Sequence, residues 1–165
     1  MKRIRAFVFL LLVGAISSVA CVAASAQTRI EVPKNKYSIA TTGEVTVNRQ
    51  SAISGATVFS DSTVTTAKGS SAVVSLGKLG RVELKSETTV KLTFTDSNFT
   101  LTTDDGQITS GDKKAEVTID TSCGNTWVAV KKGRVELRAG NSVKQIAAGN
   151  QDTAGTATPG CTPGR

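Results

Sequence analysis

The stretch that decides the fold is Gly69-Ser70-Ser71-Ala72-Val73-Val74-Ser75-Leu76-Gly77-Lys78-Leu79-Gly80-Arg81-Val82-Glu83-Leu84-Lys85. After Gly80, charged and apolar residues alternate, which is the pattern of a β-strand with one buried and one solvated face. We therefore predict that Val82 and Leu84 point into a core. The glycine before the strand predicts a turn or bulge whose φ angle disfavours a side chain.

The second half of this stretch returns later in the chain as Gly133-Arg134-Val135-Glu136-Leu137-Arg138, and Gly106-Gln107-Ile108 is a fainter copy. An all-β unit is therefore reused. The arginine and the glutamate of each copy share the solvated face, and we expect them to pair with each other across strands, for a few tenths of a kcal/mol to about 1 kcal/mol. This role is structural, since the motif has neither a ligand's nor a catalyst's geometry.

Further short strands are predicted along the chain, about ten residues apart and separated by turn signals. They are 43–48, 56–59, 63–66, 70–76, 81–85, 89–94, 99–102, 106–109, 115–120, 126–131, 134–138 and 142–147. Threonine, serine and valine dominate, which favours extended backbone, and no helical period follows residue 30. We predict an all-β fold, a β-solenoid-like stack of short strands, with a twisted β-sandwich as the alternative.

The N-terminus has the features of a secretory signal. Lys2, Arg3 and Arg5 precede an apolar run over 6–20, and the small residues of 24–26 suit a signal peptidase. We predict cleavage before Gln27 and export to the periplasm or the extracellular space. Acylation of Cys21 as a lipoprotein is one alternative, and an uncleaved anchor is another.

Cleavage leaves 139 residues with 17 Lys/Arg and 13 Asp/Glu, a net charge of +4. We divide the chain into a signal peptide (1–26), an exposed lead-in (27–40), one β domain (41–150) and a Gly/Thr/Pro-rich tail (151–165). Order is expected to begin near Tyr37. The lead-in and the tail are expected to cap the stack, and the tail to have no regular structure.

Several strand motifs resemble those of the FecR-type periplasmic domain. The segments are Gly43-Glu44-Val45-Thr46-Val47, the threonine-rich 63–66, the apolar strand 70–76, 81–84 with 88–90, the hairpin 128–135 and the closing Ile146-Ala147-Ala148-Gly149. The resemblance spans about 41–150, although the turn before the central strand differs from the family's usual Asp-Gly-Ser. It implies the family's fold and an envelope-facing role as a binding or signalling-related interaction module.

The sequence contains few of the residues that catalysis or metal binding would require. The chain has no histidine, and the mature part has no Ser-x-x-Lys motif. Asp96, Asp104 and Asp105 are expected near one another at strand ends, yet they lack the spacing of a calcium loop. Asn98-Phe99-Thr100 fits a glycosylation acceptor, to which a bacterial setting gives no role. We predict a protein that is not an enzyme and has no cofactor.

Basic residues gather late in the chain, at Lys113, Lys114, Lys131, Lys132, Arg134, Arg138 and Lys144. They suit an anionic polysaccharide, a lipid phosphate or an envelope protein, whereas nucleic acid is disfavoured for an exported chain without interleaved aromatics. A polysaccharide-binding or surface-adhesion module is therefore the alternative function. Trp127 is the proposed discriminator, because a buried ring favours the interaction module and an exposed ring in a groove favours the polysaccharide.

After signal removal, two cysteines remain, Cys123 and Cys161. An even pair in an oxidising compartment predicts a disulfide. Both residues lie in sequences typical of bends, which leaves their geometry free to adjust. The bond would fix the tail over the last layer of the stack.

Overall fold

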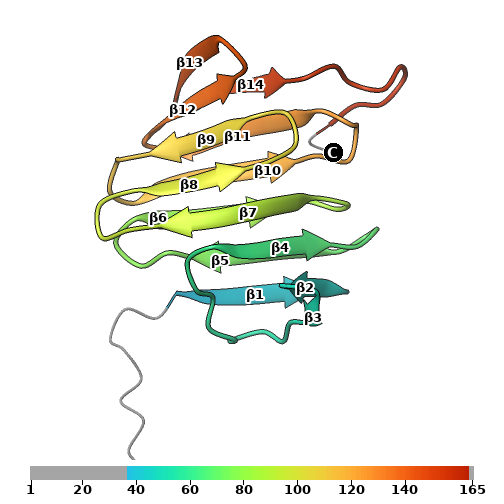
Figure 1. The fold of residues 1–165 in the computed structure, drawn as a ribbon, viewed down its shortest axis with the longest axis vertical. Coiled ribbons are helices and arrows are strands. Elements are labelled where there is room, and N and C mark those ends of the chain that lie inside the picture. Colours follow the sequence, from blue (N-terminus) through green and yellow to red (C-terminus); the bar gives the residue numbers. More distant parts are fainter. Residues whose placement is uncertain (1–36, 164–165) are drawn as a thin grey trace, which may run out of the picture. The chain divides into compact units, whose positions relative to one another are not determined.

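Fourteen strands form two β-sheets that share one hydrophobic core (Figure 1). The computed structural model describes residues 37–163. The predicted signal peptide, its cleavage site, Cys21 and most of the lead-in lie outside the described residues. No helix occurs within 37–163, so the prediction of an all-β fold is confirmed.

The six-stranded sheet has the order β1-β5-β6-β10-β11-β14. Its strands are β1 (Ser38–Thr42), β5 (Ser71–Ser75), β6 (Gly80–Leu84), β10 (Ala115–Asp120), β11 (Thr126–Lys132) and β14 (Gln151–Ala154). The eight-stranded sheet has the order β13-β12-β9-β8-β7-β4-β2-β3. Its strands are β2 (Val45–Val47), β3 (Gln50–Ser51), β4 (Ser62–Thr66), β7 (Thr89–Phe94), β8 (Phe99–Thr102), β9 (Gln107–Ser110), β12 (Arg134–Ala139) and β13 (Ser142–Ala147).

The chain alternates between the two sheets and advances along both in the same direction, from β1 to β3 at the bottom of Figure 1 to β13 and β14 at the top. All strand pairs are antiparallel except β6 and β10, which are parallel. A solenoid stacks the strands of successive coils in parallel, so these pairings do not show the solenoid that we predicted. The fold is a sandwich-like pair of sheets, which agrees with the β-sandwich that we gave as the alternative.

The core is aliphatic, and the predicted strand faces are correct. Val82 and Leu84 in β6, and Val135 and Leu137 in β12, are each at most 1% exposed. The two copies of the repeated motif lie in different sheets, so the repeat is one of strand pattern and not of stacked layers. Gly80 and Gly133 have φ angles of 135° and 80°, as the motif predicts.

Three predictions about the chain's ordered parts need correction. The tail predicted to lack regular structure contributes β14, which pairs with β11. Ile39 in β1 is 1% exposed, so the sandwich begins inside the predicted lead-in of 27–40. The segment 56–59 forms a single bridge, from Thr57 to Ser38, in place of a strand.

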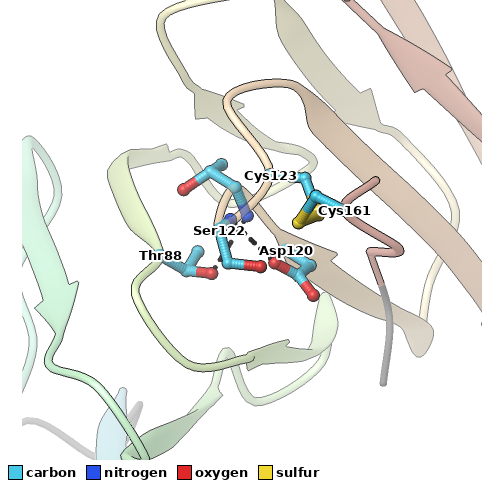
Figure 2. The surroundings of a disulfide bond; sticks show 6 residues. Thr88, Asp120, Ser122, Cys123 and Cys161 are labelled. Carbon is cyan, nitrogen blue, oxygen red and sulfur yellow. Dashed lines mark hydrogen bonds between the residues drawn. A yellow bond between two sulfur atoms is a disulfide. The ribbon is translucent and has the colours of Figure 1, made fainter. Parts of the chain in front are cut away.

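A disulfide between Cys123 and Cys161 fixes the end of the tail (Figure 2). The turn that carries Cys123 is itself held in place, because the Thr121 N–H donates to Thr88 Oγ1 at 3.1 Å and the Ser122 N–H donates to Asp120 Oδ1 at 2.8 Å. The bond therefore connects the tail to a rigid turn at the end of β10.

Candidate functional site

The structure divides the predicted basic cluster into cations that are paired with carboxylates and cations that are not. Arg138 and Lys144 are neutralised on the outer surface, where Arg138 Nη2 lies 3.1 Å from a Glu136 oxygen and Lys144 Nζ lies 2.8 Å from an Asp152 oxygen. Lys144 and the Thr153 N–H bond to the Asp152 carboxylate and lower its pKa. These two cations are already paired and leave little charge for a partner.

The other group lies at one end of the sandwich and includes two residues that the sequence did not indicate, Lys78 and Arg81. We call this group the basic end. Its members are Lys78, Arg81, Lys113, Lys114, Lys132 and Arg134, all exposed. Three segments far apart in the chain supply them: the β5–β6 turn with the start of β6, the β9–β10 turn, and the junction of β11 and β12.

Backbone pairing brings these segments together. The Lys114 N–H donates to the Lys78 carbonyl at 3.0 Å, because the β9–β10 turn runs beside the β5–β6 turn. One strand further, Glu116 lies opposite Arg81 on one side and Lys132 on the other. The cations therefore surround the end of the sandwich, from the six-stranded sheet to Arg134 on the eight-stranded sheet.

None of the six cations has an ion-pair partner within 37–163. Two carboxylates of the same segments, Asp112 and Glu116, also have none, so they offset only part of the charge. Like charges that gather without partners repel one another and weaken the folded state. The arrangement is therefore suited to a negatively charged partner, which would remove that repulsion.

Lys131 differs from its neighbour Lys132, because it has a carboxylate partner. Lys131 Nζ lies 2.7 Å from a Glu83 oxygen, and Lys85 approaches the other oxygen at 3.4 Å. The hydrogen bond from Lys131, helped by the charge of Lys85, lowers the pKa of Glu83 although partial burial opposes the shift. The expected pairing of Arg81 with Glu83 and of Arg134 with Glu136 is wrong. Glu83 pairs with Lys131 and Lys85, and Glu136 pairs with Arg138 of its own strand.

A polar depression of about 530 Å³ adjoins the basic end on the outer face of the eight-stranded sheet. It is lined by Gln107, Thr109, Gly111, Asp112, Arg134, Val135, Glu136, Arg138 and Gln145. At its centre, Glu136 accepts hydrogen bonds from Arg138 and from Gln145 Nε2, at 3.1 and 3.2 Å. The depression thus offers planar hydrogen-bonding groups with little net charge.

The three aspartates that we expected near one another are separated. Asp96 lies in the β7–β8 turn, whereas Asp104 and Asp105 lie in the β8–β9 turn at the other end of β8. Within residues 37–163, no group of three or more histidine, cysteine or acidic side chains is placed to hold a metal ion. The Asp105 carboxylate instead accepts a hydrogen bond from Thr126 at 3.3 Å.

The ring of Trp127 is neither buried nor fully exposed, so it does not distinguish between the two candidate functions. Trp127 lies on the strand face opposite the buried Val128 and Val130, which is the outer face of the six-stranded sheet, and its side chain is half-buried. A half-buried ring supports neither of the two functions over the other.

Comparison of the chain with protein-family models, with curated proteins and with solved structures found no match in any of the three. Within the described part of the chain, no helix has the length and apolar character needed to cross a membrane. A function is therefore proposed below from the geometry and charge of the site.

Proposed function

We propose that this protein is an exported, non-catalytic module of the bacterial envelope with a FecR-like domain, and that its basic end binds an anionic partner. The observation that supports the proposal is the convergence of six unpaired cations from three segments on one end of the sandwich. Charge complementarity of this kind accelerates encounter and selects partners. The FecR-like strand pattern supports an interaction role related to signalling.

An envelope polysaccharide-binding or adhesion module is the second candidate. The polar depression beside Arg134 supports it, because the glutamine, arginine and carboxylate groups there match the hydroxyls of a sugar chain. Both candidates use the same end of the molecule, and they differ in whether the partner is a protein or a glycan.

The test measures binding of the mature chain, 27–165, to three anionic probes: polygalacturonate, poly-L-glutamate and vesicles containing phosphatidylglycerol. The variant Lys114→Gln/Lys132→Gln removes two charges from the basic end. Its matched control, Arg49→Gln/Lys68→Gln, removes two exposed charges elsewhere that likewise have no ion pair within residues 37–163. Two exposed charge contacts are together worth on the order of 1.4 kcal/mol, so we expect roughly tenfold weaker binding in the variant.

The control variant should bind like the wild type, and added salt should weaken binding of both. The proposal fails if the wild type binds none of the three probes at low salt. It also fails if the two double variants lose the same affinity, because binding would then follow net charge and not the basic end.

A further inference from the structure

A pocket of about 380 Å³ opens beside Lys78, at the same end of the sandwich as the basic end. Its lining comes from the start of β1, the β5–β6 turn and the β7–β8 turn, and consists of Tyr37, Leu76, Gly77, Lys78, Leu79 and Asp96. We call it the Tyr37 pocket. Its volume lies in the range of small-ligand sites, roughly 300 to 1,000 Å³.

The pocket includes an aromatic ring whose position is fixed, whereas its two leucines belong to the hydrophobic core. Leu76 and Leu79 are 0% and 3% exposed. The Tyr37 ring packs on Phe94 with centroids 4.2 Å apart, and the Tyr37 carbonyl accepts a hydrogen bond from the Val58 N–H. A ring held in this way presents an apolar surface at little entropic cost.

A second aromatic residue, Phe59, lies between two residues that are hydrogen-bonded to Tyr37 and Phe94. Val58 bonds to the backbone of Tyr37, and the Ser60 hydroxyl both donates to the Phe94 carbonyl at 3.0 Å and accepts from the Phe94 N–H at 2.9 Å. Phe59 stands between them and is 69% exposed. Three of the chain's aromatic residues are therefore gathered at this end.

Two opposite charges lie among the lining residues, and neither is used within the fold. Lys78 and Asp96 are both exposed, and within residues 37–163 neither has an ion pair or a side-chain hydrogen bond. The pocket therefore presents a donor and an acceptor beside an aromatic ring.

This combination discriminates among anionic partners. A lipid phosphate, an acidic peptide and an acidic sugar unit are all attracted by Lys78 and repelled by the Asp96 carboxylate. A phosphate group or a glutamate side chain has neither hydroxyls that donate to Asp96 nor a ring that packs on Tyr37. An acidic sugar unit uses all three groups: its carboxylate pairs with Lys78, its hydroxyls donate to Asp96, and the C–H face of its ring packs on Tyr37. The Lys78 carbonyl accepts the Lys114 N–H, so the pocket adjoins the basic end directly.

We propose that the Tyr37 pocket binds one sugar unit of an anionic polysaccharide whose neighbouring units lie along the basic end. This inference rests on the proposed function and decides the class of the anionic partner. The pocket supplies selectivity for a sugar, and the basic end supplies attraction for any polyanion.

The experiment compares polygalacturonate, which carries sugar rings and carboxylates, with poly-L-glutamate, which carries carboxylates alone. In the mature chain, Asp96→Asn and Tyr37→Leu should each weaken polygalacturonate binding roughly tenfold, as expected for the loss of about 1.4 kcal/mol. Neither should weaken binding to poly-L-glutamate, and Asp96→Asn should strengthen it by removing a repulsive charge. Asp104→Asn, in the turn at the other end of β8, is the matched control and should leave the affinity for both polymers unchanged.

The inference would be overturned if Asp96→Asn and Tyr37→Leu weakened binding to polygalacturonate and to poly-L-glutamate equally, or if they left polygalacturonate binding unchanged. Thermal melts of each variant show whether Tyr37→Leu disturbs the packing on Phe94, and Asp96→Asn remains decisive in that case. If Lys114→Gln/Lys132→Gln has no effect on binding while the pocket variants weaken it, the proposed role of the basic end is contradicted and the proposed sugar site in the Tyr37 pocket is supported. If the wild type binds neither polymer, amide shifts at Leu76 and Lys78 on adding trigalacturonate support the pocket alone, and their absence overturns it.

Discussion

The Cα atoms of Cys123 and Cys161 lie 5.5 Å apart, and a disulfide joins these residues across 38 positions of the chain. Cys123 is buried in the β10–β11 turn, at 1% exposure, whereas Cys161 is exposed. The tail also folds back through its own backbone, because the Thr158 N–H donates to the Cys123 carbonyl at 2.7 Å. The tail is thus attached to the sandwich at two neighbouring points.

Breaking this disulfide should lower the free energy of unfolding substantially. Closing a loop of this length stabilises a protein by roughly 4 kcal/mol in the chain-entropy model. We expect Cys161→Ser to lose up to that amount in urea unfolding, since the exposed Cys161 leaves no cavity when it is replaced. Thiol titration of the unreduced, unfolded wild type is the control, and two free thiols would contradict the bond.

Replacing an inward valine of the repeated motif should be far more damaging than replacing its outward glutamate. Val82→Asp and Val135→Asp bury a carboxylate without a partner, at a cost of several kcal/mol out of a total stability of roughly 5 to 15 kcal/mol. Glu83→Ala and Glu136→Ala remove half-buried carboxylates whose ion pairs lie at the protein surface, and should cost on the order of 1 kcal/mol. Thermal melts of the four variants test this order, and the reverse order would mean that the strand faces are assigned backwards.

Gly80 should tolerate a side chain much less well than Gly77, three residues before it. Gly77→Ala places a side chain in open space at a φ of 57°, which costs roughly 1 to 2 kcal/mol. At Gly80 the φ is 135°, and a Cβ atom would overlap the backbone of Ala115 in the parallel partner strand. We expect Gly80→Ala to cost about 3 kcal/mol or more in urea unfolding. Equal losses in the two variants would contradict the close approach of β6 and β10.

The alternating pattern was sufficient to locate most strands. β7, β8, β10 and β13 have the bounds that the sequence predicts. In β7, β8 and β10, apolar and polar residues alternate without interruption. β14 was missed because the glycines and prolines after it dominate the composition of the tail. The arrangement of the sheets depends on pairings between distant segments, above all the parallel contact of β6 with β10, and local patterns contain no information about these.

The same limit applies to the candidate site. Lys113, Lys114, Lys132 and Arg134 were recognised because they are close in sequence. Lys78 and Arg81 precede them by more than thirty residues, and only the pairing of β6 with β10 brings them to the same end. Arg138 and Lys144 were included in the predicted basic cluster because they are close to it in sequence. In the structure their charges are paired with Glu136 and Asp152, so they do not belong to the basic end. The Tyr37 pocket combines three distant segments, which no sequence motif connects.

Export should produce a mature chain that begins at Gln27. The basic start, the apolar run over 6–20 and the small residues of 24–26 predict cleavage at this position. Intact-mass measurement of the exported protein tests it. A mass that corresponds to an acylated Cys21 or to a chain beginning at Met1 would contradict the prediction and leave the module attached to a membrane.

Removing Lys131 should raise the pKa of Glu83. The hydrogen bond and charge of Lys131 hold this pKa below its ordinary value of 4.5, and Lys85 adds a smaller effect in the same direction. Because the pKa is lower in the folded state, the ionised pair stabilises the fold above about pH 4.5, and that stabilisation disappears as the pH falls through the folded-state pKa.

In Lys131→Gln, the pKa of the Glu83 carboxyl should therefore be higher in NMR titrations than in the wild type. The variant should also lose less stability than the wild type when the pH is lowered through this range, because it has less ionic stabilisation to lose. Lys132→Gln is the matched control, since Lys132 has no ion pair within residues 37–163 and should leave the pKa of Glu83 unchanged. An equal shift in both variants would show that the general charge of the basic end, and not the 2.7 Å contact with Lys131, sets the titration of Glu83.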